Sequence, residues 1–169
     1  MVIVIVGVLS ASGVFLLTYL VESSAKVPSQ LNMDMVASDL LDTMVEGDSQ
    51  AKGLRFCQAV TAISSTQINF VNQDAQNIQY RLGADAKMYR KIGTDPERVI
   101  PYYAATGVFV LGDQGKVFRF YNASDAEISS GPQNVRRIAI AIIAQTTAGT
   151  PSDWDGRSKQ SSSVAVHRF

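Results

Sequence analysis

The sequence predicts an α+β protein in which a long N-terminal hydrophobic helix packs on a small antiparallel β-sheet head. Three observations lead to this prediction. The first 21 residues carry no charged side chain, a helical pattern of apolar residues follows, and the second half of the chain alternates between apolar and polar residues over short stretches. Alternation with a period of two is typical of strands that bury one face.

Residues 1–27 are expected to form a transmembrane helix. Met1 to Val21 reads MVIVIVGVLSASGVFLLTYLV, and the first charge is Glu22. At 1.5 Å per residue, about 21 residues span roughly 32 Å, which matches the apolar core of a bilayer. A cleaved signal peptide would carry a basic segment before the apolar run. A buried core helix that is apolar on every face rarely suits a domain of this size.

Residues 28–66 are expected to form a helical spine outside the membrane. Pro28 should bend or end the first helix. A second helix is then predicted over Asn32–Val45, with Asp34 as its cap and with four apolar residues on or near its inner face, Met35, Leu40, Leu41 and Met44. A third is predicted over Ala51–Ile63, with Leu54, Cys57, Ala59 and Val60 on its inner side.

Residues 67–169 are expected to form the β-rich head. Alternating stretches predict five strands, over Gln67–Val71, Asn77–Leu82, Lys87–Ile92, Val135–Ala144 and Ser162–Arg168. Gly112-Asp113-Gln114-Gly115 lies between two apolar stretches, Val108–Val110 and Val117–Phe120, and predicts a β-hairpin. In the long strand, Ile138, Ile140 and Ile142 share one face and should point into the core.

The N-terminal stretch MVIVIVGVLSA resembles the apolar segment of type IV prepilins and type II secretion pseudopilins. In that family a basic leader ending in Gly, an aromatic residue and a Glu precede such a run. The resemblance therefore implies that the reading frame extends upstream of Met1, with Glu directly before it. The stretch NVRRIAIAIIAQ and the end SSSVAVHRF resemble the closing strands of minor pilin-like proteins.

This resemblance implies a pilin-like fold and a non-enzymatic role as a minor subunit of a type IV pilus-like or pseudopilus filament. The subunit would be anchored in the inner membrane by a single pass before assembly, with a periplasmic or extracellular head. Its partners would be other pilin-like subunits, contacted through the N-terminal helix, and the assembly machinery. Gly7, Ala11 and Gly13 would permit close approach of neighbouring helices in the membrane.

Composition excludes several other classes of function. Lys and Arg number 15, as do Asp and Glu, so the formal net charge is zero, which argues against nucleic acid as the main partner. One cysteine, Cys57, excludes an intramolecular disulfide framework, and its apolar neighbours predict that it is a core residue. One histidine, His167, excludes a metal site built on a histidine cluster. The sequence contains no phosphate-binding loop or zinc-protease motif, and no cofactor is expected.

Two weaker candidate sites and two alternative functions stay open. Asp153 and Asp155 are candidate calcium ligands in a loop, but no Glu follows at the EF-hand distance, so a solvated turn is the competing interpretation. A mild basic cluster near Tyr89 could contact DNA or an anionic surface, and it consists of Lys87, Arg90, Lys91 and Arg98. The chain could also be a bitopic membrane-anchored extracytoplasmic binding domain that does not polymerise, or an extracytoplasmic enzyme.

Overall fold

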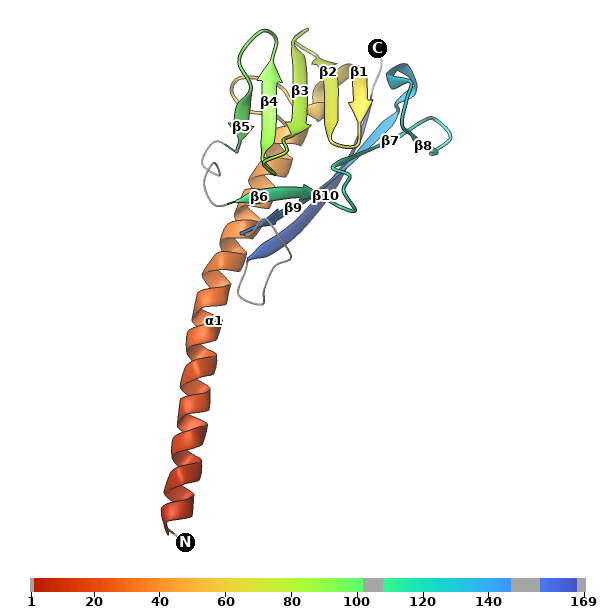
Figure 1. Ribbon diagram of the computed structural model, residues 1–169. Helices are drawn as coiled ribbons and strands as arrows, with labels where there is room; N and C mark the ends of the chain where they lie inside the picture. The colour runs from red at the N-terminus through yellow and green to blue at the C-terminus, as the bar shows by residue number, and fades with distance from the viewer. Residues whose placement is uncertain (1, 102–107, 147–155, 167–169) are drawn as a thin grey trace.

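A long helix carries a head made of two β-sheets (Figure 1). The computed structural model describes residues 2–101, 108–146 and 156–166, and the side chains at 2–13, 22, 23, 25, 26, 28 and 29 lie outside this description. Helix α1 (Val2–Val45) is continuous over 44 residues. The backbone then turns at Gly47, whose φ of +94° favours glycine, and passes through the 3-10 turn η1 (Leu54–Phe56) into the strands.

The first sheet is an antiparallel meander of five strands that are joined in sequence order. Its strands are β1 (Cys57–Ser64), β2 (Gln67–Asn72), β3 (Asn77–Leu82), β4 (Met88–Ile92) and β5 (Arg98–Ile100). Alternate residues of the central strands are buried, as a sheet with one covered face requires. Phe70 and Tyr80 illustrate this, because neither is exposed and their ring centroids lie 5.7 Å apart.

The second sheet is built around one long central strand, β9 (Arg137–Gln145), which pairs with β10 (Arg157–Ala165) along its whole length. On its other edge β9 pairs with two short strands in turn, β6 (Phe109–Gly112) and β7 (Phe118–Tyr121). The small strand β8 (Glu127–Ile128) extends the sheet beyond β7, and the 3-10 turn η3 (Pro132–Asn134) leads into β9.

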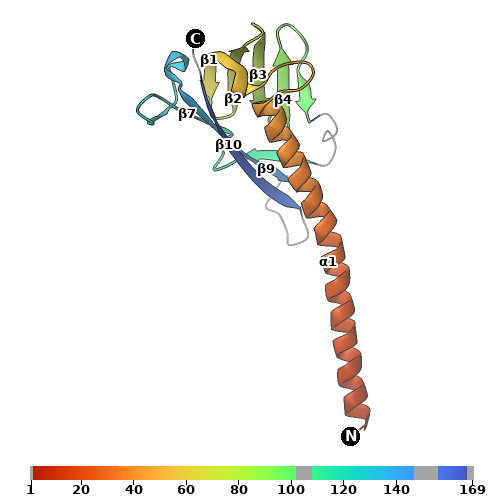
Figure 2. The same cartoon turned by 180° about the vertical axis from the view of Figure 1, so that it is seen from behind.

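The C-terminal part of α1 closes the core against this second sheet, and Figure 2 shows the helix crossing β9 and β10. Its buried residues recur at spacings of three and one, which is the pattern of a helix with one apolar face, and they are Met33, Val36, Ala37, Leu40, Leu41, Met44 and Val45. The two sheets meet through backbone bonds, since the amides of Val117 and Phe118 both donate to the Ser65 carbonyl.

The expected fold class, with a long hydrophobic helix packed on one small antiparallel sheet, is wrong. The described structure is mostly β, with ten strands in two five-stranded sheets. The apolar N-terminal segment of α1 packs on neither sheet, because its large side chains from Val14 to Val21 are all at least 60% exposed. Among the described side chains of α1, those that meet the head begin at Gln30.

Within the described residues, no helix combines the length and the apolar character that crossing a membrane requires. This finding overturns the predicted transmembrane helix over residues 1–27 and the predicted single-pass inner-membrane location.

The predicted helical spine over residues 28–66 is also wrong in its boundaries. The helix neither ends at Pro28 nor begins again at Asn32, so Asp34 is not a cap, and Met35 is 67% exposed rather than on the inner face. Residues 57–64 form strand β1 instead of a third helix. Register shifts at Cys57/Ala59 and Val60/Ala62 break the strand alternation, so buried Cys57 and Val60 lie three residues apart and imitate a helical period.

The predicted hairpin around residues 112–115 forms only its turn. Asp113 and Lys116 make an isolated bridge, but β6 and β7 do not pair with each other. Both strands pair antiparallel with β9, because that nine-residue strand offers room for two short partners on one edge. The strands predicted near β2, β3, β4 and β9 are confirmed, and Ile138, Ile140 and Ile142 are at most 1% exposed.

Candidate assembly surface

Helix α1 leaves the head at Gln30, where one side chain makes two bonds to the backbone of β10. Gln30 Nε2 donates to the Arg157 carbonyl oxygen at 2.6 Å, and the Arg157 amide donates to Gln30 Oε1 at 3.3 Å. The Gln30 side chain thus makes, at the start of β10, the two backbone hydrogen bonds that a neighbouring strand would otherwise make. Met33, about one helical turn closer to the head, is buried, with 1% of its surface exposed. Gln30 therefore marks the boundary between the packed and the free part of the helix.

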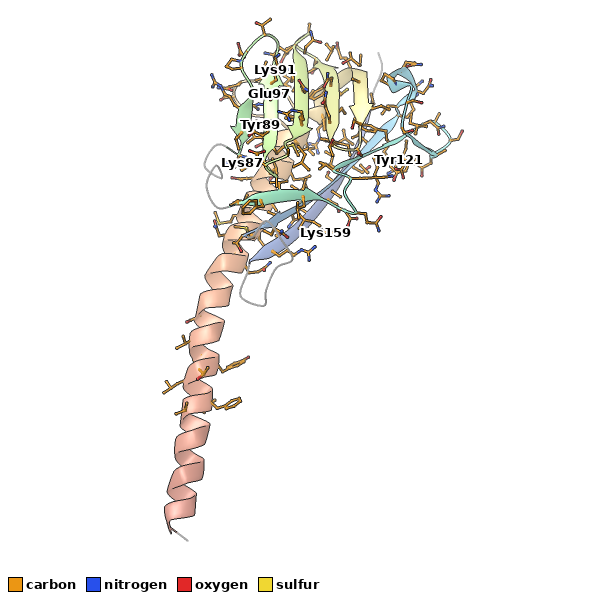
Figure 3. All side chains as sticks on the ribbon, viewed as in Figure 1. Lys87, Tyr89, Lys91, Glu97, Tyr121 and Lys159 are labelled. Carbon is orange, nitrogen blue, oxygen red and sulfur yellow. The ribbon has the colours of Figure 1, made fainter. Side chains whose placement is uncertain are left out.

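The free part of α1, residues 2–29, extends about 42 Å from the head at 1.5 Å per residue (Figure 1). Its described side chains point into open space away from the strands (Figure 3). The segment 14–21 has no charged residue, and its seven large hydrophobic side chains are between 60% and 82% exposed. These are Val14, Phe15, Leu16, Leu17, Tyr19, Leu20 and Val21. We call this segment the apolar collar.

Two hydroxyl groups in and beside the apolar collar bond to the helix itself. Thr18 Oγ1 donates to the Val14 carbonyl oxygen at 2.9 Å, and Ser24 Oγ donates to the Val21 carbonyl oxygen at 2.8 Å. Such bonds satisfy a hydroxyl without an external partner. The polar groups of these two residues therefore do not oppose burial of the helix surface in an apolar environment.

The apolar collar surrounds the helix instead of forming one stripe. Successive residues of an α-helix are turned by about 100°, so eight consecutive residues point in every direction around the axis. A single groove on a partner would cover only one side of such a surface. Several helices packed around it would cover every side. The geometry is therefore suited to a bundle of helices.

The residues singled out from the sequence fall in different places. Gly7, Ala11 and Gly13 lie on the free part of α1, in the region whose side chains lie outside the description. Asp153, Asp155 and His167 lie outside the described residues altogether. Among the residues that are described, no group of three or more His, Cys, Asp and Glu side chains is arranged to hold a metal ion. Cys57 is 3% exposed, which confirms it as a core residue.

The predicted basic cluster does not form one surface. Alternation along β4 places Arg90 on the buried side with Met88, while Tyr89 and Lys91 lie on the other face, as Figure 3 labels them. On that face Tyr89 donates to Asp85 Oδ2 at 2.7 Å, and this bond raises the pKa of Tyr89. Arg90 is therefore separated from Tyr89 and Lys91, and the predicted cluster is divided between the two faces of β4.

The sequence showed that the residues of the collar are apolar. It did not lead us to a buried arginine site at the junction of β4, β5 and the turn after α1. Arg90 is 6% exposed, and its Nη2 donates to Asp48 Oδ2 at 2.8 Å and to Gln50 Oε1 at 3.1 Å. Burial raises the pKa of Asp48, but hydrogen bonds from Arg90 and from the Gln50 and Ala51 amides outweigh it and leave that pKa lowered. The period-two pattern of β4 is a signal that could have placed Arg90 on the buried side with Met88.

Comparisons with known proteins add no family. No protein-family model, no curated protein and no solved structure matches this chain. Inferences about its function therefore depend on its own residues and on the resemblance of its N-terminal segment.

Proposed function

We propose that this chain is a non-enzymatic structural subunit of a filament of the type IV pilus or type II secretion pseudopilus kind. The apolar collar packs against the same segment of other copies, and the heads cover the resulting bundle of helices. Other pilin-like subunits are its partners. The observation that carries this proposal is the exposure of the apolar collar on all sides of a helix that stands free of its own head.

Solvent exposure of such a surface is unfavourable, which supports association. Each Å² of apolar area removed from water contributes about 25 cal/mol, and exposed apolar patches of this kind are typical of interaction sites. A second copy offers an identical surface, and because the collar surrounds the helix, one copy cannot cover it. Repeated contacts between copies that do not close into a ring produce a filament. The non-polymerising binding domain considered from the sequence provides no contact between copies that would cover the collar.

Charge introduced into the apolar collar tests this proposal. The full chain is compared with the double variant Phe15→Asp, Leu20→Asp by sedimentation velocity and by electron microscopy. We expect the unchanged chain to form large species with regular filament order, and the variant to sediment as a monomer. The matched control is Ser161→Asp, Ser163→Asp, which adds the same charge at exposed positions of β10 and should assemble normally. A monomeric unchanged chain, or amorphous particles without order, would refute the proposal.

A further inference from the structure

Two arginines face each other across the outer edge of the first sheet. In the antiparallel pair of β4 and β5, Arg90 is the direct partner of Arg98. Directly opposite residues lie on the same face with their Cβ atoms about 5 Å apart, and like charges in this position are destabilising. Arg98 is exposed and has no ion-pair partner among the residues that the structure describes. The register therefore concentrates positive charge at one point.

Asp48 neutralises only one side of this pair. Its carboxylate and the Gln50 side chain both bind Nη2 of Arg90, while Nη1 is buried and has no hydrogen-bond partner among the described residues. A buried N–H of a charged group that lacks an acceptor is costly, and such groups in native proteins are normally paired. The positive charge of the two arginines is therefore only partly compensated by the described residues.

A cavity of about 350 Å³ lies beside the two arginines. Arg90 and Arg98 both line it, together with Gln50, Gln76, Ile92, Asp95 and Pro96. The volume is at the lower end of the range for small-ligand sites, which is about 300–1,000 Å³. Ile92 and Pro96 supply apolar wall, the exposed Arg98 supplies hydrogen-bond donors, and Arg90 adds positive charge. The cavity combines the features of a site for a small anion with a short carbon skeleton.

The chemistry of the cavity favours a carboxylate over a phosphate. A carboxylate accepts two parallel N–H bonds from arginine and brings one negative charge. A phosphate dianion would bring nearly two charges close to Asp48 and Asp95, and like charges repel. We propose that this cavity binds a carboxylate group through the guanidinium of Arg98, with the positive charge of Arg90 beside it. The carboxylate belongs either to a small organic acid or to an acidic side chain of a neighbouring copy of this chain.

Thermal denaturation of the full chain in sodium acetate tests the site, with sodium chloride at equal ionic strength as the reference. We expect acetate to raise the midpoint by about 2–4 °C when its concentration is well above its dissociation constant. Arg98→Gln should weaken acetate binding about tenfold, and because Arg98 is exposed this variant should fold. Arg136→Gln removes another exposed arginine that does not line the cavity and should retain the full shift.

Sedimentation of the same samples distinguishes the two sources of carboxylate. If a free organic acid is the ligand, acetate raises the midpoint and leaves self-association unchanged. If a neighbouring copy supplies the carboxylate, acetate weakens self-association at constant ionic strength, and Arg98→Gln weakens it as well. Equal midpoints in acetate and chloride, with self-association unaffected by Arg98→Gln, would overturn the proposal.

Discussion

Arg90 on β4 and Asp48 in the turn after α1 form an ion pair of 2.8 Å that joins the end of the helix to the first sheet. The arginine side chain is 6% exposed and that of the aspartate 38%. The pair therefore differs from the exposed pair of Lys52 and Asp74, in which both side chains are more than 40% exposed. A buried guanidinium loses its hydration on folding and depends on its protein partners.

Asp48→Asn should destabilise the fold by roughly 2 kcal/mol, because it removes the charge beside Arg90 while Oδ1 can still accept the Gln50 and Ala51 amides. Asp74→Asn is the control and should cost less than about 1 kcal/mol.

The contribution of Asp48 to stability should depend on pH. The folded-state pKa of Asp48 is lowered, so its stabilisation is present above about pH 4 and is lost as the pH falls through the folded-state pKa. Urea denaturation from pH 7 to pH 3 should show the difference between wild type and Asp48→Asn shrinking; a constant difference would contradict this role.

Tyr80→Phe should reveal an alkaline limit of stability. Tyr80 is fully buried and donates to the Thr43 carbonyl oxygen at 3.2 Å, so the variant should be about 1 kcal/mol less stable at pH 8. Burial raises the pKa of Tyr80 well above its ordinary value of 10.0. The fold therefore favours the protonated phenol, and its stabilisation is complete below pH 10 and falls as the pH rises further.

By pH 11 the wild type should lose about 1.4 kcal/mol relative to Tyr80→Phe, which makes the two proteins nearly equal in stability. Denaturant titrations at pH 8, 10 and 11 measure this. If the difference in unfolding free energy between wild type and Tyr80→Phe were the same at all three pH values, the burial of the hydroxyl would be contradicted.

Gly47→Ala should destabilise the turn that ends α1. Gly47 has φ of +94°, and a Cβ there would overlap the Ala51 carbonyl oxygen and lie 2.5 Å from the Gly53 nitrogen. Gly93 also has a positive φ, of +55°, but a Cβ at that position would meet nothing within 4 Å. Both alanine variants incur the backbone cost of about 1 kcal/mol. In chemical denaturation we expect Gly47→Ala to lower the free energy of unfolding by roughly 2 kcal/mol more than Gly93→Ala does, because of the added overlap. Equal losses for the two variants would mean that the turn has room for a Cβ atom.

Ile138→Asp should unfold the head. Ile138 is not exposed, and it lies opposite Phe120 on β7 and Val164 on β10 in the middle of the second sheet. An unpaired carboxylate there should cost roughly 3–5 kcal/mol, and a thermal melt followed by circular dichroism measures the loss. Ser163→Asp on the same sheet is exposed and should leave the melt unchanged. An unchanged midpoint for Ile138→Asp would show that this face is not part of the core.

Strands with regular alternation could be predicted from the sequence, because their pattern reports a single buried face. Ile78, Tyr80 and Met88 follow this rule and lie in β3 and β4 as expected. The rule failed at β1, where bulges gave buried Cys57 and Val60 a helical spacing. It also failed for the partners of β6 and β7, since pairing with β9 is a long-range choice that a local turn signal does not contain.

The candidate sites were less predictable than the strands. The apolar collar is visible in the sequence, but its environment is not, because an apolar helix can be covered by lipid, by its own head or by other helices. The arginine cavity depends on the register of Arg90 with Arg98 and on the turn that brings in Asp48, forty-two residues before Arg90 in the chain. Neither relationship leaves a periodic signal.

Cysteine crosslinking in the apolar collar tests most directly whether copies of this chain pack around one another's helices. Phe15→Cys and Leu17→Cys are about 200° apart on the helix, and both are introduced into the full chain carrying Cys57→Ala, once that background is shown to melt normally. Packing on all sides predicts an oxidised ladder of dimers, trimers and larger species. The control Ser161→Cys, Ser163→Cys on exposed β10 positions should give no such ladder. Monomers alone, or dimers without larger species, from the collar variant would contradict assembly into a filament.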